Sequence, residues 1–249
     1  MFYGILFGVI MSASFLFAML GLGGALVYVP VLKWAGFPVK EVAIPTALLL
    51  NGFTTIMALT TYARHKLVDW KGGLALTASA FLFAPLGAYA TRFIPVKGLL
   101  ILFSVAVGVA AIRMILFSRQ PEPDKMFSIK ARSVIGAIVG AFAGFMAGLL
   151  GVGGGFIIAP LLIWMGYKTK QAAATTAFAV AFSSFSGFLG HLAAGHFEPG
   201  LTAVLVLAVL AGSFAGSRFM VSTAKPKWVK QLYVLVLLTI AVKLLYGVF

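Results

Sequence analysis

Long apolar segments alternate with short polar ones along the chain. Several apolar runs are about 20 residues long, which is the length of helix that crosses a hydrocarbon core of ~30 Å. The clearest runs are Leu74–Ala90, Gly98–Phe117, Leu201–Ala215 and Val229–Phe249. Within each run the apolar residues are continuous, whereas the strands of a membrane β-barrel would alternate apolar and polar residues. The pattern therefore predicts an all-α integral membrane protein.

The longest polar stretch divides the chain almost in half. Residues 119–132 contain Pro121, Glu122, Pro123 and Asp124, a composition typical of an exposed linker. We expect a first transmembrane repeat at residues 1–118 and a second at residues 133–249, which together form one integrated membrane domain.

The two halves repeat one another at an offset of 130 residues. Residues 21–36 read GLGGALVYVPVLKWAG, and residues 151–166 read GVGGGFIIAPLLIWMG. Eleven residues of the first half recur at this offset in the second: Gly21, Gly23, Gly24, Pro30, Leu32, Trp34, Gly36, Lys40, Ala43, Thr46 and Ala47. Several of them are Gly, Pro or Trp, which shared apolar composition does not explain. The sequence indicates an internal duplication, a common construction for secondary transporters.

The repeated glycine phrase predicts a broken helix in each half. Glycine adopts backbone angles that other residues avoid, so Gly21–Gly24 is suited to end a helix near Leu20. The apolar stretch that follows, Ala25–Trp34, has about ten residues and is too short to cross the membrane at ~1.5 Å per residue. We expect a re-entrant hairpin made of a long helix, a break and a half-helix, followed by three transmembrane helices. The second half should repeat this plan.

The distribution of basic residues predicts that the two repeats are inverted. If both hairpins return to their starting side, five Lys and Arg residues lie on one face of the membrane and fourteen on the other. If each hairpin crosses once, the division is ten to nine. The positive-inside rule favours the first arrangement, which places both termini outside and the linker in the cytoplasm. The Lys and Arg residues behind the net charge of +14 then serve to orient the spans in the membrane. No nucleic-acid partner is expected.

The glycine breaks also predict an anion site. A half-helix that begins at a glycine cluster presents unpaired N–H groups and the positive end of its dipole. The alternative is that these glycines only allow close helix packing. The next helix of each half carries a polar face that could add hydrogen bonds, although such hydroxyls often bond within their own helix. The candidate substrate-binding residues are Gly23, Gly24, Thr46, Asn51, Thr54, Gly153, Gly154, Gly155, Thr176, Ser183 and Ser184.

Ionisable residues contribute less to this picture. No acidic residue lies deep within a predicted span, which argues against a carboxylate proton relay and favours an anionic substrate. His191 lies near an apolar span and is a candidate for proton coupling, with a hydrogen-bonded structural role as the alternative. There is no cysteine, no HExxH-type metal spacing and no nucleotide-binding fingerprint in a βαβ setting. We expect no metal, no cofactor and no enzymatic activity.

The paired GxGGG-type phrases, the AxxT-rich helices that follow them and a GH-type loop before the next span resemble the TauE/SafE family of sulfite exporters. The resemblance covers both halves. It implies a multi-pass transporter in a bacterial or archaeal cytoplasmic (inner) membrane that exports sulfite, an organosulfonate or a similar anion. The residues carried over from the motif are Gly21–Gly24, Gly151–Gly155, Thr46, Thr176 and Ser184. Ala25 replaces the last glycine of the first copy, and Pro45 stands where a small residue is expected, so the two halves of the site could be unequal.

These features together predict a secondary transporter in which a small anion binds near the midplane and alternating access moves it across the bilayer. Two alternatives remain open at this point. One is a passive anion channel of the same architecture, and the other is a membrane scaffold subunit that transports nothing. A homodimer is compatible with the sequence.

Overall fold

The computed structural model describes residues 2–118, 125–192 and 199–224, together with seven residues between Trp228 and Thr239. Within these residues all regular secondary structure is helical. The helices are α1 (Phe2–Leu20), α2 (Ala25–Trp34), α3 (Ile44–Arg64), α4 (Trp70–Ala90), α5 (Val96–Ser118), α6 (Ile129–Leu150), α7 (Gly155–Trp164), α8 (Thr169–His191) and α9 (Pro199–Ser222). A π-helical turn, Val39–Ala43, precedes α3, and a 3₁₀ turn, Thr91–Phe93, follows α4. The centre of the predicted linker, Pro121–Asp124, and most of the predicted last span, Val229–Phe249, lie outside the described residues.

Five of the helical segments are long and apolar enough to cross a membrane. They are Val39–Arg64, Trp70–Phe93, Ile129–Leu150, Thr169–His191 and Pro199–Ser222. The predicted all-α membrane class is therefore confirmed. Helix α6 begins at Ile129, because the Ser128 hydroxyl accepts a hydrogen bond from the Ala131 N–H and caps the helix. Residues 129–132, predicted to belong to the linker, are thus helical.

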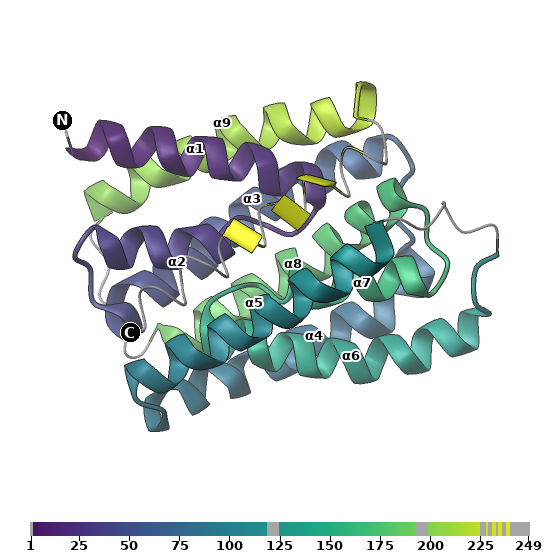
Figure 1. The fold of residues 1–249 in the computed structure, drawn as a ribbon, viewed down its shortest axis with the longest axis horizontal. Helices are drawn as coiled ribbons and strands as arrows, with labels where there is room; N and C mark the ends of the chain where they lie inside the picture. The colour runs from purple at the N-terminus through teal and green to yellow at the C-terminus, as the bar shows by residue number, and fades with distance from the viewer. Residues whose placement is uncertain are drawn as a thin grey trace.

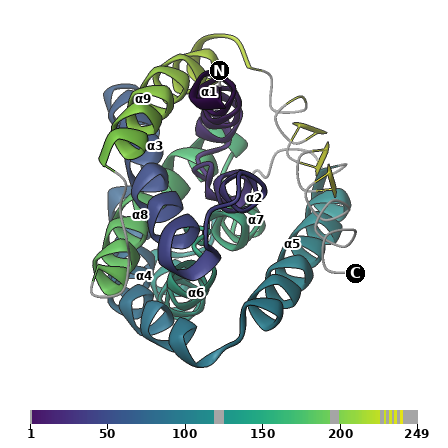
Figure 2. The same cartoon turned by 90° about the vertical axis from the view of Figure 1, so that its left-hand side faces the viewer.

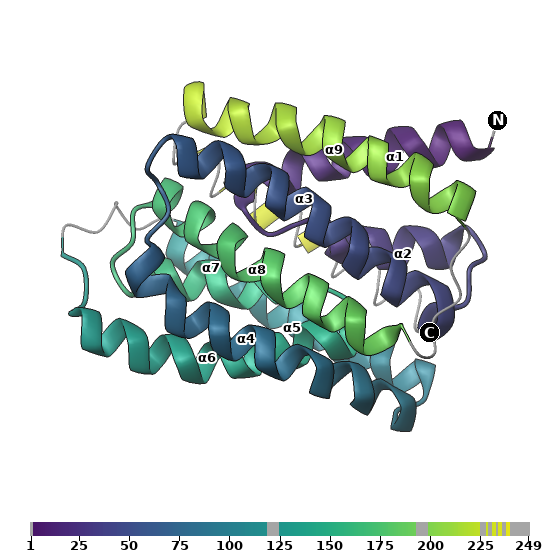
Figure 3. The ribbon, with the colours of Figure 1, turned by 180° about the vertical axis from the view of Figure 1, so that it is seen from behind.

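The helices form two layers. Helices α9, α3, α8 and α4 lie side by side in that order (Figure 3). Behind them α1 packs on α9 and α6 packs on α4, with the short helices α2 and α7 between α1 and α6 (Figure 2). Helix α5 lies at the edge of the bundle (Figure 2). Each of these helices has a counterpart about 130 residues away in the chain: α4 corresponds to α9, α3 to α8 and α1 to α6. Replacing every helix by its counterpart reverses the order of the helices within each layer.

Both glycine phrases interrupt their helices where the sequence predicts. Helix α1 ends at Leu20 and α6 ends at Leu150, and α2 and α7 each begin five residues later, at Ala25 and Gly155. Gly21 and Gly23 have φ of +67° and +68°, and Gly153 and Gly154 have +72° and +71°. These left-handed angles strain any residue with a side chain, which explains why glycine recurs. After the first break the chain turns back, and α2 runs opposite to α1 (Figure 1).

Candidate anion-binding site

Asn51 of α3 lies between the two glycine breaks. Its Oδ1 accepts a hydrogen bond of 2.9 Å from the N–H of Ala25, the first residue of α2. Its Nδ2 donates at 2.8 Å to the Ser184 hydroxyl on α8. A Cβ added to Gly23 or to Gly153 would collide with this same amide group. The two breaks, 130 residues apart in the chain, therefore meet at one side chain that is completely buried.

The predicted polar residues all lie in the protein interior. Thr46, Asn51, Thr54, Thr176, Ser183 and Ser184 are each at most 1% exposed. The Thr54 hydroxyl is 2.9 Å from the Tyr28 hydroxyl of α2, so it connects α3 to the first half-helix. Ser183 donates to the Gly153 carbonyl at 3.4 Å, so it connects α8 to the second break. The Thr176 hydroxyl is buried and has no hydrogen-bond partner within the described part of the chain.

Each break packs against the long helix of the other half. A Cβ on Gly21 would collide with the Ala173 carbonyl of α8, and one on Gly151 would lie 3.0 Å from the Ile44 side chain of α3. The breaks also contact each other, because a Cβ on Gly155 would lie 2.8 Å from the Leu22 carbonyl oxygen. All five glycines of the candidate set (Gly23, Gly24, Gly153, Gly154 and Gly155) are buried. The described packing therefore joins the two halves at the breaks.

Side chains from α3, from α8 and from the 3₁₀ turn after α4 satisfy carbonyls left where α1 and α6 end. The Tyr62 hydroxyl lies 2.6 Å from the Ala18 carbonyl and 3.0 Å from the Met19 carbonyl at the end of α1. At the end of α6, the Thr91 hydroxyl donates to the Leu149 carbonyl at 3.0 Å. His191 Nε2 is 2.8 Å from the Gly148 carbonyl, which can only accept, so this nitrogen carries the proton. His191 is 5% exposed, and through this hydrogen bond it caps the end of α6.

An ion-pair cluster joins the halves at the start of α4 and α6. Arg132 forms a salt bridge with Asp69 and donates to the Tyr167 hydroxyl at 3.0 Å, and that hydroxyl donates to Asp69 at 2.9 Å. Burial raises the pKa of Asp69, but hydrogen bonds from the Gly72 N–H and Tyr167 and the charge of Arg132 outweigh it and hold that pKa below its usual value. Burial and the bond to Asp69 raise the pKa of Tyr167 to about 12. At neutral pH Asp69 is therefore ionised and the Tyr167 hydroxyl keeps its proton.

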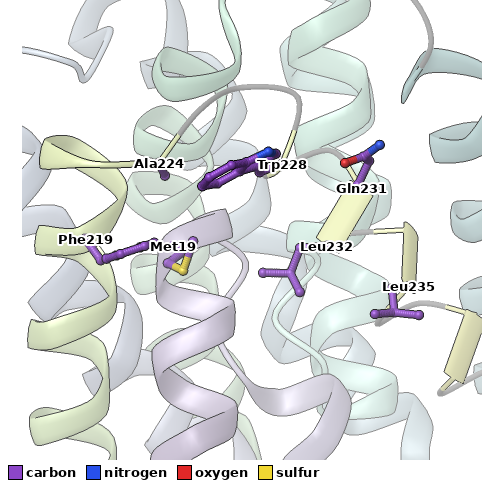
Figure 4. Close-up of a pocket in the computed structure, with 7 residues that line it drawn as sticks. All are labelled: Met19, Phe219, Ala224, Trp228, Gln231, Leu232 and Leu235. Carbon is purple, nitrogen blue, oxygen red and sulfur yellow. The ribbon is translucent and has the colours of Figure 1, made fainter.

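The structure also has an apolar cavity of about 340 Å³ on its flank (Figure 4). It lies between the end of α1 at Met19, the end of α9 and the segment that carries Trp228 and Leu235. Gln231 supplies the one amide among the seven side chains that line it, and Trp228 adds an indole N–H. One amide and one indole do not suit a hydrated oxyanion, so this cavity is distinct from the candidate site. Within the described residues, no three His, Cys, Asp or Glu side chains lie together as a metal site would require.

Two features of this region escaped the sequence analysis. Tyr28 and Tyr62 appear in the sequence as apolar-segment residues, and only the fold reveals which helices their hydroxyls connect. Asp69 belongs to a polar stretch between spans, which is typical of an interfacial charge. Its partner Arg132 lies 63 residues away, and no local spacing signals such a pair.

Apolar helices of membrane-spanning length, interrupted by two half-helices that meet at buried neutral donors, are typical of a polytopic membrane transporter. The sequence agrees with this class. Residues 6–244 match the family described as Sulfite exporter TauE/SafE, and the chain belongs to that family.

The relatives are membrane transporters by name. The chain is 24% identical over 259 residues to the "Probable membrane transporter protein YunE" of Bacillus subtilis, covering 93% of each chain. It is 24% identical over 247 residues to the "Probable membrane transporter protein YfcA" of Escherichia coli, covering 98% of this chain and 89% of the relative. It is 35% identical to the "Sulfite exporter TauE/SafE family protein 1" of Arabidopsis thaliana, over 32% of this chain and 18% of the relative. No solved structure matches the chain.

Proposed function

We propose that this protein is a secondary transporter that exports a small sulfur-containing anion, such as sulfite or an organosulfonate, by alternating access. The observation that carries the proposal is the meeting of both glycine breaks at Asn51 and Ser184. An anion placed there would receive hydrogen bonds from half-helix N–H groups, from an amide and from hydroxyls. The description of the family as sulfite exporters supports the choice of substrate class.

The chemistry of the site suits an anion. Half-helix N-termini carry partial positive charge, and neutral donors cost less to bury than the side chain of a Lys or Arg. The polar side chains around the breaks are hydroxyls and one amide, with no carboxylate among those described to repel an anion.

The contacts of the helix ends support re-entrant hairpins. The Phe127 N–H, just before α6, donates to the Met165 carbonyl, just after α7, at 3.0 Å. The ring centroids of Phe127 and Trp164 are 5.1 Å apart. The segment from α6 to α7 thus begins and ends at the same side of the bundle, as a re-entrant hairpin would.

The ends of α1 and α6 support inverted repeats. Helix α1 ends against Tyr62, close to the end of α3, whereas α6 ends against Thr91, at the far end of α4. Residues 65–69 connect the end of α3 directly to the start of α4, so Tyr62 and Thr91 lie at opposite ends of α4. These contacts support a fold in which equivalent helices run in opposite directions. We infer that both termini lie outside the cytoplasmic membrane and that the linker is cytoplasmic.

The cluster at Asp69 supports alternating access, because it ties the two halves together at one end of the bundle and the corresponding residues at the other end cannot form it. Asp69, Arg132 and Tyr167 correspond at an offset of 130 to Pro199, Phe2 and Phe37, none of which is ionisable. The Arg132–Asp69 ion pair joins the halves on the side that we infer to be cytoplasmic, and the corresponding positions on the other side carry no ionisable side chain. A cycle that opens this mouth must separate Arg132 from Asp69.

A binding and flux experiment tests the proposal. The thermal unfolding midpoint of the purified protein is measured with sulfite, sulfate, thiosulfate, sulfoacetate, taurine and a simple carboxylate. A transported anion should raise the midpoint by mass action. Proteoliposome flux should saturate and respond to an imposed gradient, whereas a passive channel would conduct without coupling and a scaffold would bind nothing.

A pair of serine variants localises the site. Ser184→Ala removes a hydroxyl at the breaks, and Ser186→Ala removes one that donates to the Phe81 carbonyl on α4 instead. Each loses one hydrogen bond, which costs about 1 kcal/mol of stability. Only Ser184→Ala should weaken stabilisation by the anion. Equal responses in the two variants would contradict the assignment of the site.

A further inference from the structure

The two half-helices start differently, although their sequences are related. The N–H of Ala25, the first residue of α2, donates to Asn51 Oδ1 at 2.9 Å. The corresponding residue of α7 is Gly155, and no described side chain accepts from its N–H. We propose that the anion binds at the start of α7, with Thr176 and Ser184 as donors, while Asn51 occupies the start of α2 as a built-in cap. This inference rests on the proposed function and refines where its site lies.

Asn51 closes the first half-helix in a way that the second cannot copy. The residue at an offset of 130 from Asn51 is Ala181, which has no polar side chain to place at the start of α7. Tyr28 adds to the closure, because a Cβ on Gly24 would collide with its ring. The position that corresponds to Tyr28 is Ile158. The start of α2 is thus both hydrogen-bonded and covered.

The start of α7 is surrounded by donors that lack acceptors. Ser184 accepts from Asn51 Nδ2, so its own proton remains available, and the described residues include no acceptor for it. Asn51 Nδ2 carries a second proton and lies against Gly153, where a Cβ would collide with it. A Cβ on Gly153 would also lie 3.0 Å from Ser184 Oγ, so both donor groups lie against the second break.

Thr176 is the independent sign that a ligand belongs here. Its side chain is completely buried, and its Oγ1 has no partner among the described residues. On α8 it lies three residues after Ala173, whose carbonyl packs on Gly21, and four residues before Val180, which packs on Gly153 and Gly155. Residues three and four apart share a helix face, so Thr176 lies on the face that covers both breaks. A buried hydroxyl without a partner costs stability, and a bound oxyanion would satisfy it.

The duplication supplies a matched test of this unequal site. Thr176→Val removes a hydroxyl at nearly constant volume, and Thr46→Val makes the same change at the corresponding position of α3. Both side chains are buried, and the unpartnered Thr176 hydroxyl can be lost at little cost to folding. The thermal unfolding midpoint is followed as sulfite is added. Thr176→Val should need about tenfold more sulfite for half of the full stabilisation, and Thr46→Val less than about twofold more. Equal effects, a larger effect of Thr46→Val or an unchanged Thr176→Val would overturn the inference.

A second measurement keeps this inference separate from the proposed function. If sulfite and the other anions fail to stabilise the wild type, the proposed function fails, and the chain can still be probed with a thiol reagent that is itself a small sulfonate. The chain contains no cysteine, so Thr176→Cys and Thr46→Cys each provide a single thiol. Labelling with 2-sulfonatoethyl methanethiosulfonate is compared with labelling by its trimethylammonium analogue. At Thr176→Cys the anionic reagent should react about tenfold faster than the cationic one, because of the positive end of α7. An equal or greater anionic preference at Thr46→Cys would overturn the inference.

Discussion

Asp69 is the residue whose ionisation the structure connects most directly to the packing of the two halves. Its carboxylate caps α4 through the Gly72 N–H and pairs with Arg132 at the start of α6. Because the folded state holds its pKa below the usual value of 3.8, ionised Asp69 stabilises the fold above that pH. The contribution disappears as the pH falls through the lowered folded-state pKa.

Asp69→Asn should therefore be less stable than the wild type at neutral pH, with the gap in unfolding midpoint narrowing below about pH 4. The asparagine can still accept from the Gly72 N–H, so the change isolates the charge. Thermal unfolding from about pH 6 down to about pH 3 measures the gap. Glu41→Gln is the control, since Glu41 is exposed and removing its charge should give no such convergence. A gap that stays constant with pH would show that the ion pair does not stabilise the fold.

At this scale the sequence predicted which residues are buried near the breaks but not how they connect. Thr46, Thr176 and Ser184 follow from the repeat and from the polar faces of their helices. The bridging role of Asn51 depends on the approach of α8 to α3, which no local pattern contains. The same holds for Arg132 and Asp69, whose partnership depends on the packing of α6 on α4.

At the scale of the elements, glycine and helix length carried most of the prediction. The ends of α1 and α2 were predictable because a glycine cluster allows left-handed backbone and leaves only ten apolar residues behind it. The beginning of α6 was predicted less accurately. The Ser128 cap lies within a stretch whose polar composition indicates a linker. The sequence offered a hydrogen-bonded structural role for His191, but the carbonyl that it bonds was not predictable, and neither was the role of Tyr62, since both side chains come from other helices.

The capping role of His191 can be separated from proton coupling by a conservative change. His191→Gln keeps an N–H donor that can reach the Gly148 carbonyl, whereas His191→Leu leaves that carbonyl without its partner. We expect His191→Gln to unfold near the wild-type midpoint and His191→Leu to lose about 1–3 kcal/mol. The dependence of transport on pH should be the same in His191→Gln and the wild type. A profile that flattens in His191→Gln would instead assign the proton-coupling role to this residue.

At the scale of the whole molecule, the orientation in the membrane was inferred mainly from the distribution of Lys and Arg along the chain. Fourteen of the basic residues fall on one predicted face, and charge bias of this kind sets the direction of insertion. Trp34 and Trp164, the corresponding residues at the ends of α2 and α7, are 52% and 46% exposed. Tryptophan is enriched at membrane interfaces, so inverted repeats would place these two at opposite surfaces of the bilayer.

One pair of cysteine variants tests the inversion. Pro38 and Lys168 correspond at an offset of 130, are both exposed and precede their helices with similar backbone angles. In the cysteine-free chain, we expect Pro38→Cys to react with a membrane-impermeant thiol reagent in intact cells and Lys168→Cys to react only after lysis. Labelling of both sites from the same side would show that the repeats are parallel.

The pairing of Asn51 with Ala181 also bears on how such a protein could arise. A half-length chain that inserted in both orientations could have formed an antiparallel dimer with the same layers, but both copies would carry the same residue at this position. An asparagine on both sides would cap both half-helices, and an alanine on both sides would cap neither. Gene fusion removes this constraint, because each half then mutates on its own. Asparagine in one half and alanine in the other can therefore occur in the fused chain, but not in a symmetric dimer of identical halves.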